Sequence, residues 1–177
     1  VHMLGAHPHY SLRFPEGANP FDDAVDAVAV RMQTKGRAAW VREFRQDYDA
    51  ALLYHDFVAS ETLRLTQASG DGTGHRAWMF VSDHGQEVGH VSDRVGHSPN
   101  TESGYRIPAL VWRSQAHGPA AQAAAATQAF RADWAGWTVA DLLQLRWSGQ
   151  RPGRNLLAAD YRWEPPALPF QVPSFVD

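Results

Sequence analysis

A short run of apolar residues that ends in an acid and an imidazole constrains this chain most. Residues 76–81 include two aromatic side chains and a valine, and this short run predicts a buried strand covered on both faces. Asp83, His84 and Gly85 follow almost directly. Adjacent residues of a strand point to opposite faces, so Asp83 and His84 can meet only where the strand ends and the chain twists. We expect Gly85 to permit this twist, because glycine adopts a positive φ without penalty.

The Asp83–His84 pair offers a carboxylate oxygen and an imidazole nitrogen, and zinc accepts both as ligands. In open α/β sheets, ligands gather at the carboxyl ends of strands, which is where this pair is expected. An Asp-His pair also fits a surface or capping role, and the dipeptide alone leaves both interpretations open.

The composition excludes several classes of function. The chain has 177 residues, enough for one domain with a sizeable core, and 44% of them are hydrophobic. The net charge is −3 without a basic block, so we expect no nucleic-acid partner. No cysteine is present, which excludes disulfides and thiolate zinc sites, and no apolar stretch is long enough to span a membrane.

Hydrophobic periodicity predicts the main elements of an α/β fold. Residues 37–67 are predicted to form a helix, because Trp40, Phe44 and Tyr48 recur at helical spacing. Residues 106–113 are predicted to form a second buried strand, with Pro108 at its start or on a sheet edge. Shorter patterns predict helical turns at 22–32, helices at 117–130 and 138–147, strand segments at 1–4 and 155–163, a polar loop at 87–104 and an extended tail at 165–177.

Four segments resemble one known family. Residues 80–85, with Glu87, resemble the metal motif of the phosphoethanolamine transferases, a sulfatase-like branch of the alkaline phosphatase superfamily. Residues 2–10, followed by Arg-Phe-Pro, are similar to the His-x-x-Gly-x-His segment of that family. Residues 48–57 resemble the helix before the metal strand, and residues 105–112 resemble the Val-Pro-x-x-x-Trp strand. The segments follow the family order.

Two further features indicate a branch of this family. The Phe-Pro-Glu-Gly run at residues 14–17 and the pair Gln86-Glu87 are more similar to the enzymes that modify lipopolysaccharide core heptose than to those that modify lipid A. The resemblance implies an alkaline-phosphatase-like central sheet flanked by helices. By the same resemblance, residues 1–177 would form a single domain. This domain would correspond to the C-terminal part of a sulfatase-like catalytic domain, so its central sheet would be incomplete.

The resemblance also implies a metal site. Asp83, His84 and His97 would bind zinc or another divalent metal, and His7 would bind the substrate phosphate or a second ion about 3.5–4 Å away. His90 matches the family pattern less well than His97. Two further residues are expected to support the site, namely His2 and Glu87.

In the resembled family a threonine is the nucleophile, and it lies before the His-x-x-Gly-x-His segment, which here means upstream of Val1. Thr62, Thr66 and Thr73 do not lie in matching motifs, so no catalytic residue is assigned and we expect the chain to be inactive alone. The implied partners are a lipid phosphoethanolamine donor, a lipopolysaccharide acceptor and the missing N-terminal half of the domain. The implied location is the periplasmic face of the bacterial inner membrane.

Two alternatives remain open. The chain could belong to a sulfatase or phosphodiesterase-type hydrolase of the same superfamily, or it could be a non-catalytic fragment. Assays with phosphatidylethanolamine, aryl sulfate and aryl phosphate would separate a transferase from a hydrolase. Metal analysis would separate either of them from a packing domain.

Overall fold

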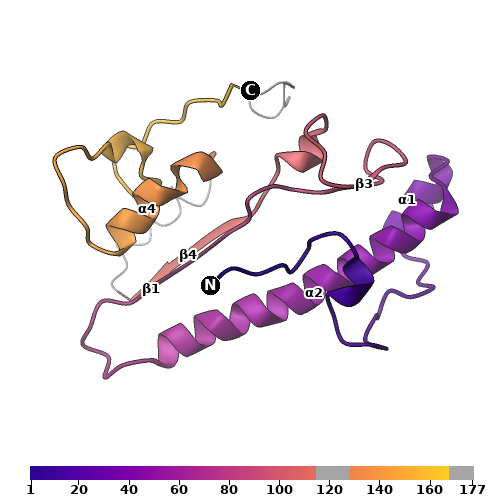
Figure 1. Cartoon of the computed structure of the whole chain (residues 1–177), viewed down its shortest axis with the longest axis horizontal. Coiled ribbons are helices and arrows are strands. Elements are labelled where there is room, and N and C mark those ends of the chain that lie inside the picture. Colours follow the sequence, from indigo (N-terminus) through magenta and orange to yellow (C-terminus); the bar gives the residue numbers. More distant parts are fainter. Residues whose placement is uncertain (115–127, 168–177) are drawn as a thin grey trace. The chain divides into compact units, whose positions relative to one another are not determined.

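The computed structural model, drawn as a cartoon in Figure 1, describes residues 1–114 and 128–167. The chain divides into two compact units. The first unit contains residues 1–62 and 84–106, and the second contains residues 63–83 and those from 107 onward. Each unit has a buried hydrophobic cluster of its own. The single-domain organisation predicted for residues 1–177 stays a prediction.

Two helices form much of the first unit. Helix α1 (Ala27–Thr34) begins after Asp26, whose carboxylate accepts hydrogen bonds from the backbone N–H groups of Val28 at 2.8 Å and Ala29 at 2.7 Å. This side chain satisfies two of the free donors at the helix start. Helix α2 (Ala39–Ala68) confirms the helix predicted for residues 37–67.

The core of the first unit forms around Tyr10, which is 1% exposed and packs with Ala51 and Val88. The Tyr10 ring meets the ring of Tyr48 edge to face, with centroids 5.1 Å apart. Burial, followed by the effect of the neighbouring Tyr48, raises the pKa of Tyr10 to about 12. Val88 and the middle of α2 are thereby held to the N-terminal segment.

Replacing Tyr10 with phenylalanine is expected to stabilise the protein. The Tyr10 hydroxyl is buried and has no hydrogen-bond partner among the described residues. Removing an unsatisfied buried hydroxyl should raise the free energy of unfolding by about 1 kcal/mol, measured by urea denaturation. Tyr54→Phe, at a side chain that is 40% exposed, is the control and should have little effect. A clear loss of stability in Tyr10→Phe would contradict this account.

A short hairpin follows residue 86, where only a polar loop was predicted. Strand β2 (Glu87–Val88) pairs antiparallel with strand β3 (Val95–Gly96), and Glu87 lies opposite Gly96. Gly89, directly after β2, has φ 87°, and a Cβ there would lie 2.5 Å from Met32 Cε and 2.7 Å from Val41 Cγ1. Only glycine fits both this backbone angle and this space.

The second unit contains the two longer strands. Strand β1 (Ala77–Val81) pairs antiparallel with strand β4 (Ala109–Arg113), side by side in Figure 1. Both predicted strands are confirmed, and β4 begins directly after Pro108, which cannot donate a ladder hydrogen bond. No residue of either strand is buried, and Leu110 of β4 is 52% exposed, so the prediction of burial is wrong for both strands within the described residues.

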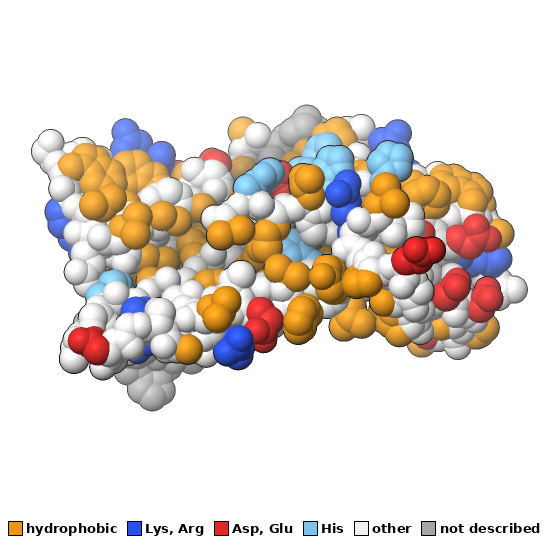
Figure 2. Space-filling view, turned by 60° about the horizontal axis from the view of Figure 1, so that its bottom comes forward, with side chains coloured by type: hydrophobic (Ala, Val, Ile, Leu, Met, Phe, Trp, Pro, Cys, Tyr) orange, Lys and Arg blue, Asp and Glu red, His pale blue; other side chains and the backbone are white. Residues whose placement is uncertain are grey.

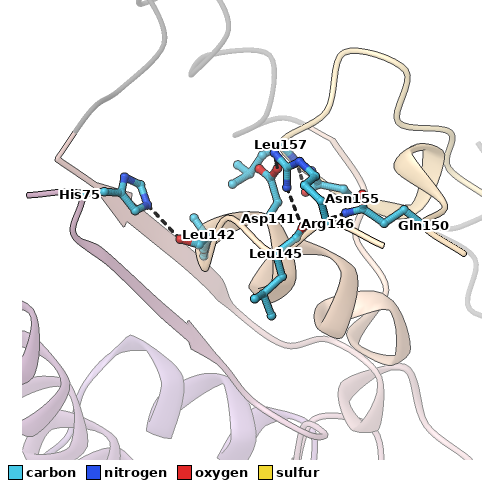
Figure 3. A network of polar contacts seen from close by, with 8 residues as sticks. All are labelled: His75, Asp141, Leu142, Leu145, Arg146, Gln150, Asn155 and Leu157. Atoms are coloured by element: carbon cyan, nitrogen blue, oxygen red, sulfur yellow. Dashed lines mark hydrogen bonds and ion pairs between the residues drawn. The ribbon is translucent and has the colours of Figure 1, made fainter. Parts of the chain in front are cut away.

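Helix α4 (Ala135–Leu142) packs in the second unit beside a cluster of Trp134, Leu156 and Tyr161. Polar side chains satisfy the carbonyl groups at and beyond its C-terminus (Figure 3). His75 Nε2 lies 2.8 Å from the carbonyl oxygen of Leu142, and the guanidinium of Arg146 donates to the carbonyl of Leu145 at 2.9 Å. Such contacts complete a helix end that would otherwise leave acceptors unpaired.

The helix predicted for residues 138–147 has the wrong boundaries. The side chain of Thr138 does not cap a helix start, because its hydroxyl accepts a hydrogen bond from the backbone N–H of Leu156 at 3.1 Å. The helix begins three residues earlier, at Ala135, and ends at Leu142. A long-range contact therefore uses the group that the sequence pattern assigned to local capping.

The strand segment predicted at residues 1–4 is wrong. Val1 is exposed and pairs with no strand, although the pattern placed it in the tail of one. The segment leads into a turn instead, since the N–H of His7 donates to the carbonyl of Leu4 at 3.2 Å. A strand needs a neighbour for its backbone groups, and the described residues provide none beside this segment.

The strand segment predicted at residues 155–163 is also wrong, because the chain turns there and the N–H of Ala158 donates to the carbonyl of Asn155 at 3.0 Å. Two other predicted elements cannot be compared with the structure. Residues 115–127 and 168–177, which include most of the predicted helix at 117–130 and most of the tail at 165–177, lie outside the described residues.

The predicted central sheet is only partly matched. The described residues form a mixed α/β arrangement whose sheets are the two strand pairs β1–β4 and β2–β3. Pairs of this size are marginal alone and depend on the packing of other elements.

Large hydrophobic side chains remain exposed in both units, and Figure 2 shows many of them at the surface. On α2 they include Phe57 at 58% exposure and Leu65 at 59%. No helix within residues 1–114 and 128–167 has the length and apolar character needed to cross a membrane.

Candidate functional site

The predicted metal motif lies where β1 ends. Asp83 is exposed, and His84 is half-buried. Residues 63–83, which end with Asp83, belong to the second unit, and residues 84–106, which begin with His84, belong to the first. The His84 Nδ1 atom lies 2.9 Å from the carbonyl oxygen of Gly85. With the proton on Nδ1, this hydrogen bond orients the ring.

His97 lies beside His84 although it comes thirteen positions later in the chain. The ring centroids are 4.1 Å apart and the ring planes are inclined by 55°. The hairpin explains this approach, because the pairing of Glu87 with Gly96 returns the chain to the start of β2. Two imidazoles of the predicted set are thus together at the surface of the first unit.

Gly85 has a different role from the expected one, because its φ is not positive. A Cβ at Gly85 would overlap the carbonyl oxygen of Ser103 and would lie 2.6 Å from that of Arg106. The N–H of Gly85 also donates to the carbonyl of Gly104 at 2.9 Å. Glycine is required here because another backbone segment passes directly against it.

Glu87 is fully buried and is bonded on both carboxylate oxygens. Its Oε2 accepts from the Ser103 hydroxyl at 2.6 Å, and its Oε1 accepts from the backbone N–H of Val91 at 3.1 Å. The carboxylate therefore ties β2 to the following turn and to the segment that passes Gly85. The sequence predicts only a supporting role for Glu87, and no pattern in it indicates the contact with Ser103.

The N-terminal segment lies next to this hairpin. The side-chain amide of Gln86 donates to the carbonyl of Ala6 at 3.3 Å, and a Cβ at Gly96 would lie 3.6 Å from Pro8 Cγ. His7, between Ala6 and Pro8, is exposed, and its Nδ1 is 3.4 Å from the carbonyl oxygen of Pro8. The backbone at His7 is thus held near the residues that flank His84 and His97.

Arg13 fixes the same loop from the other side. Its guanidinium donates to the carbonyl groups of His7 and Pro8, each at 3.2 Å. His2 is exposed beside Val1 and stays a predicted supporting residue. The threonine expected upstream of Val1 also stays a prediction, because no residue of this chain occupies that position.

Gly5 in the His-x-x-Gly-x-His segment also has a steric role. A Cβ at this position would overlap the imidazole of His55 on α2. Burial lowers the pKa of His55, which favours the neutral ring against the loop. This glycine lets the N-terminal turn lie directly on the helix.

The donor atoms are of the types that zinc binds, but too few of them lie together to complete a zinc site among the described residues. Imidazole nitrogens and carboxylate oxygens are suitable zinc ligands, and His84 has the ring orientation that second-shell hydrogen bonds give to metal ligands. Among the described residues, however, no group of three or more His, Asp or Glu side chains is close enough to hold a metal ion. The His84–His97 pair is therefore one part of a possible site.

The profile of the sulfatase family matches residues 1–140. The chain belongs to the sulfatase family. This confirms the superfamily proposed from the motif residues. Phosphoethanolamine transferase EptC of Escherichia coli (strain K12) is 33% identical over 119 residues, which are 65% of this chain and 19% of that protein. The chain thus spans about a fifth of this curated relative.

Solved structures of the relative agree with this relationship. The chain resembles the C-terminal periplasmic domain of EcEptC from Escherichia coli with a TM-score of 0.79 and 26% identity. The similarity covers 93% of this chain and 46% of that domain. A second structure of the same domain, in complex with Zn, gives a TM-score of 0.70 and 28% identity. The chain is therefore a sulfatase-family segment related to the phosphoethanolamine transferases, and its structure resembles part of the periplasmic domain of EcEptC.

Proposed function

We propose that this chain is part of a zinc-dependent transferase that moves phosphoethanolamine from a lipid donor to a lipopolysaccharide sugar. The observation that carries the proposal is the approach of His84 and His97 to a centroid distance of 4.1 Å in a sulfatase-family chain. The enzyme would act at the periplasmic face of the inner membrane, as the name of the structurally similar periplasmic domain suggests. Core heptose is the proposed acceptor within this class.

The proposal gives each site residue a role. Asp83, His84 and His97 would hold zinc, and His7 would contact the substrate phosphate or a second ion. Bound zinc would lower the pKa of the nucleophile and neutralise charge on the transferred group. An imidazole must be neutral to bind the ion. Glu87 would keep the hairpin in place, because its carboxylate is fully used by Ser103 and Val91.

The threonine nucleophile would come from upstream of Val1, in a part of the domain that this chain does not span, since it matches 46% of the relative's domain. The hydroxyls of Thr62 and Thr73 form structural hydrogen bonds. Thr62 donates to the Ala59 carbonyl at 2.7 Å, and Thr73 donates to the Asp71 carboxylate at 2.7 Å. Neither arrangement activates a hydroxyl as a nucleophile.

Zinc binding by the purified chain tests the proposal. His84→Ala and His97→Ala should each reduce zinc affinity by about 10-fold or more, measured by calorimetry at neutral pH, because each change removes a ligand rather than a supporting group. His9→Asn is the matched control, since asparagine tolerates the left-handed backbone of His9 at φ 66°. Equal zinc affinity in all three variants and the wild type would contradict the proposed site.

The hydrolase alternative keeps support from the sulfatase profile itself, which matches residues 1–140. A longer polypeptide with the complete domain would decide between the two reactions. Transfer from phosphatidylethanolamine to a lipopolysaccharide acceptor supports the transferase, and release of product from aryl sulfate or aryl phosphate supports the hydrolase.

A further inference from the structure

The first unit contains a second concave site formed by α1, by α2 and by the turn after β2. Its volume is about 360 Å³, which lies in the range of small-molecule pockets. Both basic and apolar side chains line the pocket.

Two basic residues of this pocket have no compensating charge. Arg31 lies in the last turn of α1 and Lys35 is the capping residue directly after it, and both are exposed. Within residues 1–114 and 128–167, neither side chain forms an ion pair or a hydrogen bond. Their position near the helix C-terminus is favourable for positive charge, but like charges at this spacing repel each other. Lys35 is also the only lysine of the chain.

A third cation is held in a fixed orientation. The Nε atom of Arg45 donates to Asp49 Oδ1 at 2.7 Å, and the guanidinium carbon lies 5.7 Å from the centroid of the Tyr48 ring. The terminal N–H groups of Arg45 make no hydrogen bond within the described residues and remain available. A pre-oriented guanidinium loses less entropy when it binds an oxyanion.

The remaining wall suits an organic ligand. Two apolar side chains of α1 line the pocket, namely Met32, which is 6% exposed, and Val28, which is half-buried. His90 also lines it, and partial burial and then the charge of Arg45 lower the pKa of His90. At neutral pH this imidazole can donate one hydrogen bond without adding charge.

We propose that this pocket binds a small organic phosphomonoester, with Arg31, Lys35 and Arg45 around the phosphate and Met32 and Val28 against the carbon skeleton. Two uncompensated cations match the charge of about −1.5 to −2 that a phosphomonoester carries at pH 7. Arg45 adds directed N–H donors that suit phosphate oxygens. This site uses no residue of the proposed metal site and stands independently of the transferase proposal.

The source of the phosphate can be a sugar phosphate or a lipid headgroup, and the choice of probe distinguishes them. Glycerol 3-phosphate and mannose 6-phosphate present a phosphomonoester without a cation. Phosphoethanolamine adds an ammonium group, which the basic residues should repel. Inorganic phosphate lacks a carbon skeleton and cannot contact the apolar wall. We expect the first two probes to bind more tightly than the last two.

Calorimetric titration of the whole chain with glycerol 3-phosphate tests the site. The double variant Arg31→Gln/Lys35→Gln should lose about 10-fold or more in affinity, because it removes both uncompensated charges. The control Arg151→Gln/Arg162→Gln removes the same charge from exposed positions of the second unit and should bind as the wild type does. Circular dichroism should show unchanged helix content in both variants, since all four side chains are exposed.

Three results would overturn the proposal. The first is an equal affinity for glycerol 3-phosphate in the wild type and in Arg31→Gln/Lys35→Gln. The second is an equal loss of affinity in both double variants. The third is that the wild type binds neither glycerol 3-phosphate nor mannose 6-phosphate at millimolar concentration. A loss of affinity in Arg31→Gln/Lys35→Gln alone supports the proposal.

Discussion

Replacing Gly85 with alanine is expected to destabilise the protein by about 3 kcal/mol or more, which lowers the melting temperature by about 6–12 °C. The added methyl group would overlap the carbonyl oxygen of Ser103 and crowd that of Arg106 at 2.6 Å. Both obstacles are backbone atoms, so a side-chain rotation cannot relieve them. The displaced segment would also lose the hydrogen bond from Gly85 to the carbonyl of Gly104.

Gly74→Ala is the matched control for this experiment. No atom lies within 4 Å of a Cβ built at Gly74, and its φ is not positive. Its melting temperature, measured by thermal scanning beside the wild type, should not fall. If Gly85→Ala melts as the Gly74→Ala variant does, the close backbone approach at Gly85 is wrong.

The second large effect is expected at Glu87. Glu87→Ala should lower the free energy of unfolding by about 3 kcal/mol, because it opens a cavity and removes the acceptor from two donors. The Ser103 hydroxyl and the N–H of Val91 would both lose their partner. Glu87→Gln should also destabilise, since its amide nitrogen cannot accept from either donor.

Urea denaturation measures these changes, and Glu16→Ala provides the comparison. Glu16 is exposed and forms no ion pair within the described residues, so its removal should change stability by less than about 0.5 kcal/mol. Ser103→Ala removes one of the two hydrogen bonds and should fall between Glu16→Ala and Glu87→Ala. Near-equal stability of Glu87→Ala and Glu16→Ala would contradict the role given to the buried carboxylate.

The long periodic elements could be predicted from the sequence. The helical spacing of Trp40, Phe44 and Tyr48 identified α2, and the apolar runs that became β1 and β4 were also found. The spacing of apolar residues follows the period of the element, which local sequence encodes directly. The family resemblance was confirmed for the same reason, since its four segments are contiguous motifs. The extent of burial was not encoded in this way, since Trp40 is 45% and Phe44 is 40% exposed.

Features that depend on distant partners could not be predicted. Thr138 matched a capping pattern, but its hydroxyl is used by Leu156, eighteen residues away. Gly85 was expected to have a positive φ, whereas its actual constraint is the passage of residues 103–106. No pattern around either residue contains information about these neighbours.

The candidate site was predictable only in part. His84 and His97 were chosen from motifs, and the hairpin that joins them was not predicted, because two-residue strands leave no periodic signal. The metal roles of Asp83, His84 and His97 stay predictions, as does that of His7. The complete ligand set depends on three-dimensional convergence, which spacing along a chain does not specify.

The double constraint at Gly89 has a consequence for how this protein can vary. A methyl group there meets Met32 and Val41, and the backbone angle of φ 87° disfavours every other residue by itself. A smaller residue at position 32 would free space for a side chain at position 89, but the strain of the positive φ would remain. No single second substitution therefore makes a larger residue at position 89 acceptable. Related sequences should therefore keep glycine at this position. The pocket residues Arg31 and Lys35 are exposed, so they can be replaced more freely.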